Sequence, residues 1–576
     1  MKKSKKLLTL LLGATMLVAS LFGGCSGAAG QPEATLEGAP DYSQCTEDFR
    51  RWAFSMGYDD WIMLNGEKLY FEDGFFQTKD KTEKFVDIGY NMVFVDWAFS
   101  DVGFRMGFEG SRYEKVIRDC EELGLDTLWY GREFHSLSKR EHSLIDASKW
   151  YAIEEEVQKD FVDLLYAEYR TTYYEETKLL LKLNYPEMTD EEIEAQAKES
   201  LDRKVEKDKV ERLEQYIFET YNTDKIYFKS QEQLNKFCQY LLRDMKNYPS
   251  FAGVSLMDEP NYKMFQAMRE TVIGLQSYDP DIYLMINLLP MSTNANIHVS
   301  YCEKGKDLGM IEAYKGYLNN YKKYLADVVD FIMYDDYPVC HGNMLPTYLL
   351  CHQMVSNFAK ENNLKRRIVM QTYDVGNRRV PEYADMLWQA NVSMAFGCSD
   401  LSNYMYLPSA NHIGAGLVDD NDYVVKRDGT PNPLYYDVKD MNKEIAYNAK
   451  YLGNFKYQGM KYYRTDMTAP TGWGYTVGLE NNEFSKLTSA EFYMLKDMGG
   501  MLLVTEMYDE ANDQWGYYVV NGTDPGVSSE MRVTLTFDGY KNVQVVQSME
   551  TQNVGLNQGK ITLDLGSGRG AFVMPY

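Results

Sequence analysis

The chain has 576 residues, of which 45% are hydrophobic and 25% charged, a composition typical of a globular protein with more than one domain. Its formal net charge of −25 argues against nucleic acid or an anionic membrane surface as a partner, because both are bound through clustered Lys and Arg. Aromatic residues make up 14% of the chain, and their flat faces suit sugar rings as well as ordinary cores.

Residues 1–24 have the pattern of a secretory signal. Four lysines among residues 2–6 precede an apolar stretch at residues 7–22, and Gly23 and Gly24 lead into Cys25. This ending resembles a bacterial lipobox, in which the cysteine is lipidated and becomes the mature N-terminus. We therefore expect an exported, extracytoplasmic protein that is anchored to the bacterial membrane through Cys25, with residues 25–45 as a tether. An ordinary secretory signal cleaved nearby is the alternative.

Residues 46–455 alternate short apolar strands with helical stretches, which is typical of a parallel sheet with crossover helices. Strands are expected at residues 52–56, 92–97, 127–130, 253–257, 282–287, 331–334, 368–373 and 401–406. Eight such strands favour an α/β fold of the closed (β/α)8 TIM-barrel type over an open sheet.

The connection after the third strand is much longer than a barrel loop and helix require, and its charged sequence predicts a helical insertion over about 140–225. Loops that follow barrel strands emerge at the face where barrel enzymes carry their sites, so the insertion is expected to border a pocket. A surface appendage or a partner-binding arm is an equal alternative.

The pattern changes after Tyr406. A helix is expected at residues 436–452, and alternating segments follow at residues 516–520, 531–537, 543–547 and 560–565. Asn521-Gly522 and Asp538-Gly539 are turn pairs between them. These features predict a C-terminal antiparallel β-sandwich over residues 456–576.

The fourth expected strand ends in Asp258 and Glu259. Side chains alternate along a strand, so Glu259 is expected on the inward face with Gly253 and Ser255, and Asp258 on the opposite face. Burial at a barrel mouth raises the pKa of a carboxyl, as a general acid requires. A helix-capping role after the strand is the structural alternative.

A second acidic strand end lies at Asp335 and Asp336. Glycoside hydrolysis uses two carboxyls, one as acid and one as nucleophile or base, so either aspartate, depending on the phase of the strand, is a candidate partner for Glu259. Glu133 is a further candidate carboxyl. Polar and aromatic residues suited to sugar binding occur at the strand ends as well: Asp258, Asp96, Trp97, Tyr130, Asn287, Tyr337, Gln371, Tyr373 and Tyr406.

These motifs resemble those of bacterial glycoside-hydrolase-like barrels related to clan A. The similar stretches are Gly-Val-Ser-Leu-Met-Asp-Glu-Pro at residues 253–260, Phe-Ile-Met-Tyr-Asp-Asp-Tyr-Pro at 331–338, Met-Ala-Phe-Gly at 394–397, Tyr-Tyr at 435–436 and Asn-Lys-Glu-Ile at 442–445. The resemblance covers the chain from about residue 52 to its end, apart from the helical insertion, and includes the C-terminal sandwich.

The resemblance implies that Glu259 is the acid/base, since the clan's fourth strand ends in Asn-Glu and Asp258 stands here in place of the Asn. The clan's nucleophile is a Glu at the end of the seventh strand, where this chain has Gln371 or Tyr373. Three possibilities follow: Asp335 or Asp336 substitutes for that Glu, the mechanism is unusual, or the barrel only binds carbohydrate.

No cofactor or metal is expected. The six histidines lack a close ligand pair, the cysteines lack paired zinc spacing, and the phosphate-loop and nucleophile-elbow motifs are missing from the sequence. The sequence thus favours a glycoside hydrolase acting on an oligo- or polysaccharide, with a non-catalytic carbohydrate-binding lipoprotein as the alternative. A solute-binding lipoprotein of two hinged lobes is disfavoured, because a sandwich follows the eight strands.

Overall fold

The structure is a computed structural model that describes residues 38–43, 45, 49–53, 62–64, 67–69, 79–97, 112–144, 147–220, 226–291, 309–341, 344–345, 347–374, 378–406, 424, 426, 430–464, 483–495, 499–527 and 529–576. The expected signal, Cys25 and most of the expected tether lie outside these ranges. Within them, no helix is both long enough and apolar enough to cross a membrane.

Eight parallel strands form the barrel sheet, in the spatial order β1-β10-β9-β8-β7-β6-β5-β4. Their bounds are β1 Arg50–Ala53, β4 Met92–Trp97, β5 Asp126–Gly131, β6 Phe251–Asp258, β7 Tyr283–Leu288, β8 Phe331–Asp335, β9 Lys365–Gln371 and β10 Cys398–Tyr404. Asn91 joins the two outer strands: its main-chain N donates to the Arg51 carbonyl (3.0 Å), and its Oδ1 accepts from the Arg51 N (2.8 Å). The expected (β/α)8 barrel is confirmed, with a first strand that begins two residues earlier than expected.

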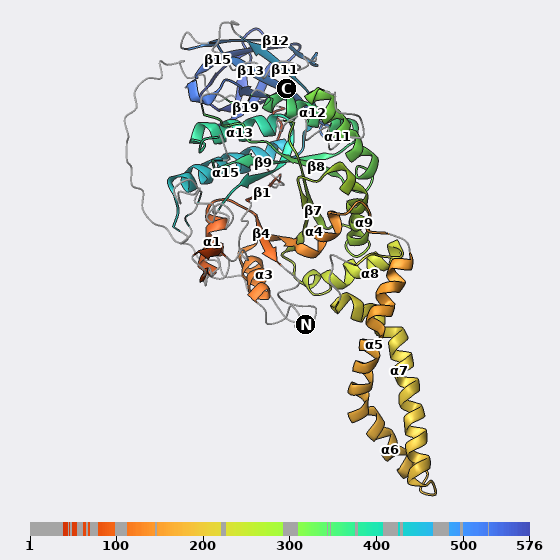
Figure 1. The fold of residues 1–576 in the computed structure, drawn as a ribbon. Coiled ribbons are helices and arrows are strands. Elements are labelled where there is room, and N and C mark those ends of the chain that lie inside the picture. The colour runs from red at the N-terminus through yellow and green to blue at the C-terminus, as the bar shows by residue number, and fades with distance from the viewer. Residues whose placement is uncertain are drawn as a thin grey trace. The chain divides into compact units, whose positions relative to one another are not determined.

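Helices lie on the outer side of the barrel strands (Figure 1). In chain order the helices are α1 Lys79–Asp87, α3 Arg112–Leu123, α4 Arg132–Ser138, α5 Ala147–Thr171, α6 Tyr173–Asn184, α7 Asp190–Thr220, α8 Gln231–Leu242, α9 Phe265–Gln276, α11 Met310–Tyr324, α12 Tyr348–Glu361, α13 Tyr383–Ala395 and α15 Pro433–Leu452. A short hairpin of β2 (Ile62–Leu64) and β3 (Glu67–Leu69) precedes α1.

Local sequence explains where several of these helices begin. The Ser230 side chain accepts from the Gln233 N at the start of α8, and Glu382 and Asp385 form a reciprocal capping box at the start of α13. Pro433 opens α15, at a position where its missing N–H leaves no helical bond unmade.

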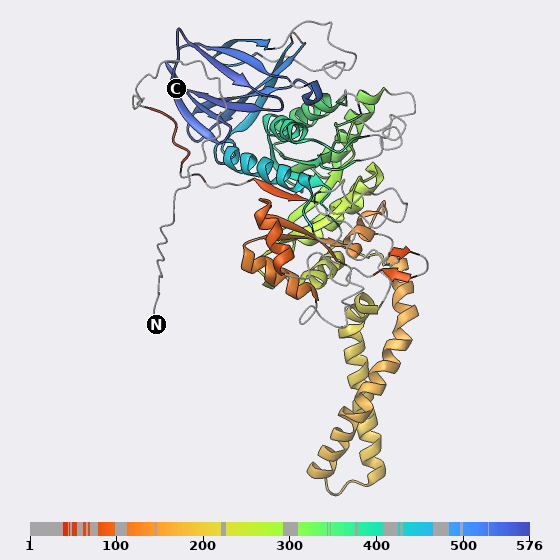
Figure 2. The same ribbon diagram turned by 90° about the vertical axis from the view of Figure 1, so that its left-hand side faces the viewer.

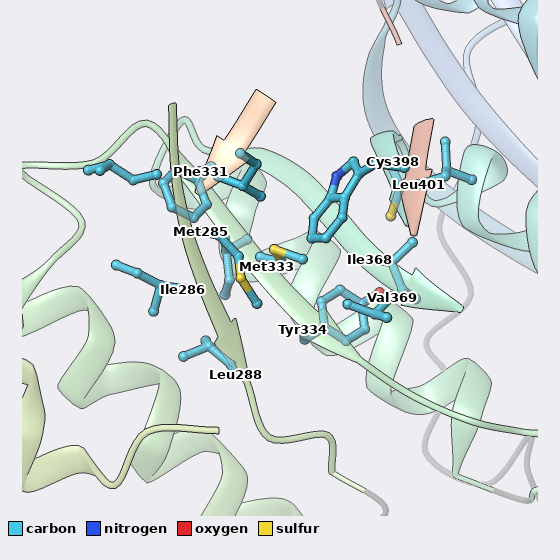
Figure 3. Packing of buried hydrophobic residues seen from close by; sticks show 14 of the residues in the cluster. Met285, Ile286, Leu288, Phe331, Met333, Tyr334, Ile368, Val369, Cys398 and Leu401 are labelled. Carbon is cyan, nitrogen blue, oxygen red and sulfur yellow. The ribbon is translucent and has the colours of Figure 1, made fainter. Parts of the chain in front are cut away.

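The barrel core is built from the apolar side chains of its strands. Met285, Ile286, Phe331, Met333 and Ile368 are at most 2% exposed and belong to one continuous cluster (Figure 3). Such runs of buried residues are expected of parallel strands, which are covered by protein on both faces. The carboxyl ends of the strands meet at the barrel mouth. Because the strands are tightly packed, the spacing between these ends is fixed.

The third connection contains the expected helical insertion. Helices α5 and α7 run side by side and are joined through α6 (Figure 2). Trp150 and Phe218, near the two ends of this hairpin, belong to the barrel's core cluster, whereas Phe161, Leu165 and Val205 form a small core between α5 and α7. Helix α6 buries no residue, so only the base of the insertion is fixed to the barrel core.

The C-terminal part is an antiparallel β-sandwich, as expected. Its six-stranded sheet has the order β11-β13-β14-β19-β16-β17, and its three-stranded sheet the order β12-β15-β18. The bounds are β11 Lys456–Arg464, β12 Leu487–Met494, β13 Met501–Asp509, β14 Gln514–Asn521, β15 Met531–Phe537, β16 Asn542–Gln547, β17 Glu550–Gly555, β18 Lys560–Leu565 and β19 Gly570–Pro575. The turn pair before β16 is confirmed, with Gly539 at a φ of +80°.

The two sheets of the sandwich differ in how they are covered. On β13, Leu502 and Val504 pack in the sandwich core, while Met501 and Leu503 pack in the barrel's cluster. The six-stranded sheet is therefore buried on both faces along this part of β13, which explains the apolar run at residues 501–504. Strand β15 alternates buried and partly exposed residues, as expected of a sheet with one face in water.

Candidate active site

The fourth barrel strand in chain order, β6, ends at Asp258, and Glu259 follows it. Both residues have accessible surface, but the protein atoms around them at the mouth are dense enough for burial to raise the pKa of each carboxyl. The main-chain N of Glu259 donates to the carbonyl of Asn287 on β7 (2.8 Å), and Glu259 has a φ of +46°, a left-handed conformation that is uncommon for a residue other than glycine. The ladder thus continues to Glu259, where the chain turns sharply at the barrel mouth.

A bulge in β6 changes which face Asp258 occupies. The register against β7 shifts between Ser255 and Met257, so that Leu256 is an extra residue on β6. Simple alternation would place Asp258 away from Glu259, but both carboxyls raise the pKa of Asp335. The structure therefore brings Asp258, Glu259 and Asp335 together, and we call these three residues the carboxylate cluster.

Burial raises the pKa of each carboxyl in the cluster, and repulsion by neighbouring carboxyls raises the pKa of Glu259 and of Asp335 further. Burial, followed by the charge of Asp258, raises the pKa of Glu259 to about 7. Burial raises the pKa of Asp335 well above its usual range, and Glu259 and Asp258 raise it further. Burial also raises the pKa of Asp258, against a hydrogen bond from Asn287 Nδ2 to its Oδ1 (2.8 Å). At neutral pH the cluster therefore retains protons that isolated carboxyls would have lost.

The structure separates the two aspartates that follow one another at the end of β8. Asp335 lies with Glu259 and Asp258. The charge of Asp336 adds to burial in raising the pKa of Tyr314, Tyr348 and Cys351, which lie on the helices α11 and α12. Both side chains are buried. Of the two, Asp335 is the residue that the fold brings to Glu259.

Two tyrosines adjoin the cluster, and a third contacts one of them. Tyr337 makes a side-chain hydrogen bond with Asp335, and its ring stacks on Tyr404 with 5.7 Å between the ring centroids. Tyr373 contacts Tyr404 at the same centroid distance. The charges of Asp258, Asp335 and Glu259 all raise the pKa of Tyr404. The sequence analysis missed Tyr404, although the pattern at the end of the last strand could have indicated it.

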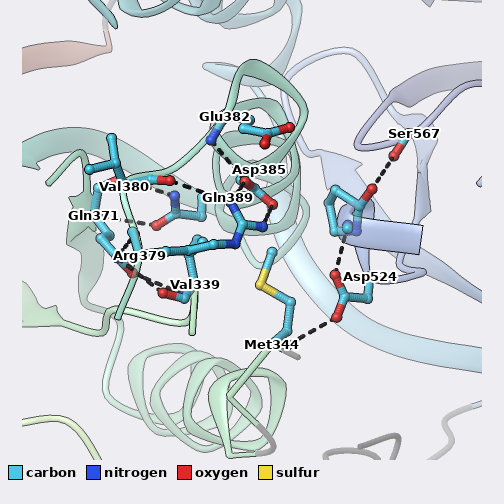
Figure 4. A network of polar contacts seen from close by, with 12 residues as sticks. Val339, Met344, Gln371, Arg379, Val380, Glu382, Asp385, Gln389, Asp524 and Ser567 are labelled. Carbon is cyan, nitrogen blue, oxygen red and sulfur yellow. Dashed lines mark hydrogen bonds and ion pairs between the residues drawn. The ribbon is translucent and has the colours of Figure 1, made fainter. Parts of the chain in front are cut away.

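Gln371 and Asn287 hold the mouth together rather than facing solvent. Gln371 is fully buried: its Oε1 accepts from the Val339 N (2.9 Å), and its Nε2 donates to the carbonyls of Val339, Tyr373 and Arg379 (Figure 4). Asn287 is 2% exposed and supports Asp258. These hydrogen bonds give both predicted sugar-binding amides a role in positioning the strand ends.

The remaining predicted residues have other described contacts, or their side chains are not described. Tyr406 is buried against Phe85 and Tyr90, with ring centroids at 4.6 and 6.0 Å, and the hydroxyl of Tyr130 is hydrogen-bonded to Nδ1 of His135. Glu133 is buried in the first turn of α4. The side chains of Asp96 and Trp97, although part of β4, lie outside the described residues.

The geometry of the cluster suits proton transfer. Within the part of the chain that the structure describes, no group of three or more His, Cys, Asp or Glu side chains is arranged to hold a metal ion. The cluster combines a solvent-accessible carboxyl of pKa about 7, Glu259, with a buried second carboxyl, Asp335. Such a pair can donate and accept protons near neutral pH, and tyrosine rings lie beside it.

No protein-family model and no curated protein matches this chain. Solved structures with a similar arrangement include a family 39 glycoside hydrolase from Bacteroides cellulosilyticus WH2, with 12% identity, a TM-score of 0.41, and coverage of 93% of this chain and 83% of the other. A family 5 glycoside hydrolase from Bacteroides vulgatus ATCC 8482 has 10% identity and a TM-score of 0.37, covering 86% of both chains. A beta-galactosidase from Bacillus circulans sp. alkalophilus has 8% identity and a TM-score of 0.40, covering 92% of this chain and 99% of the other. Similarity this remote bears on neither activity nor substrate.

Proposed function

We propose that this chain is a glycoside hydrolase that cleaves O-glycosidic bonds of an oligo- or polysaccharide, with Glu259 as the proton donor and Asp335 as the second carboxyl. The observation that carries the proposal is the meeting of these two carboxyls, from different strands of the barrel mouth, in a group that raises the pKa of each. In glycosidase sites, the surroundings of the two catalytic carboxyls typically push their pKa values apart, so that one carboxyl keeps its proton while the other is ionised.

Each group in the cluster has a role in this proposal. With a pKa of about 7, Glu259 is still partly protonated at neutral pH and can protonate the leaving oxygen. Burial and the neighbouring carboxyls raise the pKa of Asp335, and the hydrogen bond with Tyr337 opposes that rise. In this proposal Asp335, once ionised, acts as nucleophile or as the base that activates water. Tyr404 and Tyr337 supply ring faces on which a sugar can stack.

The substitution Glu259→Gln tests the proton donor. Positioned acid catalysis typically contributes about 10²–10⁴-fold in rate, so turnover of a responsive glycoside should fall on that scale while sugar binding persists. Glu506 provides a matched control: its pKa is also raised to about 7 by burial, but its carboxyl accepts from the Ser485 N in the sandwich. Glu506→Gln should leave turnover and its pH profile unchanged. Equal loss in both variants would refute the role of Glu259.

The absence of a glutamate at the end of β9 favours a second candidate, a barrel that binds carbohydrate without turnover. Gln371 ends that strand, and its described side-chain hydrogen bonds are all with main-chain atoms. A glycan array followed by a hydrolysis assay on every bound glycan separates the two functions. Retention on the array without any released sugar would establish the binding protein.

We also propose that the protein is exported and anchored through a lipidated Cys25. The lysine-rich start, the apolar stretch and the Gly-Gly-Cys sequence support this. Mass spectrometry of the exported protein should find a diacylglyceryl-modified N-terminal Cys25. A free N-terminus further along the chain, with the protein released into the medium, would contradict the anchor.

A further inference from the structure

More than half of the strongly exposed large apolar side chains among the described residues lie in the helical insertion of α5, α6 and α7. The densest group is on α6 and directly after it, where Leu179, Leu180, Leu183 and Tyr185 are 60%, 52%, 68% and 51% exposed. We call these four residues the α6 patch. Single exposed apolar residues are ordinary on a protein surface, whereas a group gathered at one place is typical of an interaction surface.

The leucines of the patch lie on the outward face of α6. Their spacing of i, i+1 and i+4 places them on one side of the helix. The other side is turned to α7: Lys178 Nζ lies 3.5 Å from Glu194 Oε1, and Tyr174 packs beside the small core between α5 and α7. Packing within the insertion therefore does not account for the three leucines, and their exposure to water is unfavourable.

The patch is at the end of the insertion that is remote from the barrel core. Trp150, near the start of α5, belongs to the barrel's core cluster, and the 25 residues of α5 span about 37 Å before α6 begins (Figure 2). Helix α6 itself buries no residue. A second molecule can therefore contact the patch without displacing any part of the barrel.

The charges of the insertion indicate what kind of surface suits the patch. Acidic residues outnumber basic ones on both α5 and α7, whereas α6 contains two glutamates and two lysines and is neutral. The acidic helices disfavour an anionic membrane surface, which repels them. The neutral helix α6, in contrast, can approach another copy of itself without a net repulsion of charge.

The order of charges along α6 is complementary to its own reverse. Glu175 and Lys182 are seven residues apart, so they lie on the same flank of the leucines, one near each end of the helix. Their side chains are 61% and 66% exposed. When two copies of α6 pack antiparallel about a two-fold axis, this flank meets the same flank of the other copy in reverse, and each glutamate approaches a lysine. Within the insertion Lys182 pairs with Asp190 (3.0 Å), but both side chains are strongly exposed and such pairs contribute little.

We propose that the α6 patch is a self-association surface, at which two copies of this chain pack α6 against α6 in antiparallel orientation. The interface is symmetric, because the same leucines and the same charged flank come from both copies. Four apolar side chains offer less area than a standard stable interface, which buries about 800 Å² per partner, so the association is reversible and of micromolar strength. It requires neither Glu259 nor the proposed hydrolysis.

The test is sedimentation velocity of the full chain over a series of concentrations. We expect the mass to rise from that of one chain to that of two as the concentration increases. Leu183→Glu puts a charge into the apolar contact and should raise the dissociation constant about 10-fold or more. Because Leu and Glu have similar helix propensities and residue 183 is exposed, the fold should be kept, which circular dichroism checks. Association through the N-terminal segment would persist in this variant.

Val210→Glu is the matched control. Val210 is 73% exposed on α7, about 30 Å along that helix from its start, and is therefore outside the patch. This variant should associate like the unchanged chain. A chain that stays monomeric at every concentration, a dimer that persists in Leu183→Glu, or equal weakening by both substitutions would overturn the inference.

Crosslinking tests the orientation. A zero-length reagent that joins carboxyls to amines is applied to a mixture of isotope-labelled and unlabelled chains, and mass spectrometry identifies the joined peptides. We expect Glu175 or Glu176 of one chain to be joined to Lys182 of the other. A dimer without such a link would overturn the antiparallel packing, and links between chains that join only residues outside α6 would overturn the α6 interface.

Discussion

Each end of the barrel contains a buried aspartate. The groups around one aspartate stabilise its negative charge, whereas the groups around the other destabilise it. Near the amino ends of the strands, burial raises the pKa of Asp400, but Arg367, Tyr283 and Trp52 all oppose that shift. The Arg367 Nε lies 3.7 Å from Asp400 Oδ2, and Trp52 Nε1 donates to Oδ1 at 2.9 Å. This aspartate is surrounded by groups that favour its charge.

At the mouth, the carboxyls that surround Asp335 disfavour its charge. Burial raises the pKa of Asp335, and Glu259 and Asp258 raise it further. Like charges gathered at one place destabilise a fold unless a ligand or a reaction uses them, whereas a matched charge helps to hold a core together. The comparison teaches that what surrounds a buried carboxyl, more than burial itself, distinguishes a functional site from a structural one.

Substitution at the mouth should produce the largest effect, and it should be on activity. Asp335→Asn is expected to reduce glycoside turnover by about 10²–10⁴-fold, because the second carboxyl of the pair is lost. Its free energy of unfolding at pH 8 should not fall, since a buried like charge is removed. Kinetics and chemical denaturation of the same preparation measure both. If Asp335→Asn lowered the free energy of unfolding and left turnover normal, Asp335 would be a structural residue rather than a functional one.

Substitution at the other end should affect stability instead. Asp400→Asn leaves Arg367 without its carboxylate and is expected to lower the free energy of unfolding by about 3 kcal/mol, the lower end of the range for removing one partner of a buried pair. Turnover per folded molecule should persist, because Asp400 lies far along the strand from the mouth. Urea denaturation followed by circular dichroism provides the measurement. The matched control is Asp330→Asn, whose exposed ion pair with Lys365 should matter little.

The smallest effect is a change in the pH dependence of stability. The folded-state pKa of Glu259 is raised from 4.5 to about 7, so between these values the folded state keeps a proton that the unfolded state loses. The free energy of unfolding should therefore fall as pH rises from 4.5 to 7 and then level off. The melting temperature, measured at each pH, should follow the same trend. In the Glu259→Gln variant it should fall less steeply between pH 4.5 and 7. An identical pH profile in the variant would show that Glu259 titrates normally.

The sequence was sufficient to place the barrel, because each strand is a short apolar run that ends in polar residues. It could not place Asp258, because one extra residue in β6, Leu256, changes the phase of alternation, and a bulge depends on pairing with β7 rather than on local sequence. For the same reason the choice between Asp335 and Asp336 stayed open until the register of β8 was known.

The last strand was predicted to run to Tyr406, but β10 ends at Tyr404, and the difference decides which tyrosine reaches the carboxyls. Tyr406 instead packs against Phe85 from α1, a contact between residues more than 300 positions apart in the chain. Gln371 was expected to bind sugar because of its strand-end position. Its burial depends on the loops that follow β8 and β9, which the sequence pattern does not describe.

The doubly covered sheet of the sandwich has a consequence for how such a protein can evolve. Tyr518 on β14 donates to Asn391 on α13 (2.6 Å), and Asp524 accepts from the Met344 N, in the loop after β8 (3.0 Å). The sandwich therefore supports the segment that follows Asp335. Gene shuffling readily exchanges modules that are joined by linkers. Exchange of this sandwich would instead expose an apolar face of the barrel to water and remove contacts that support the mouth. The two domains should consequently be inherited as a pair, and a change of glycan preference should arise by substitution within the mouth.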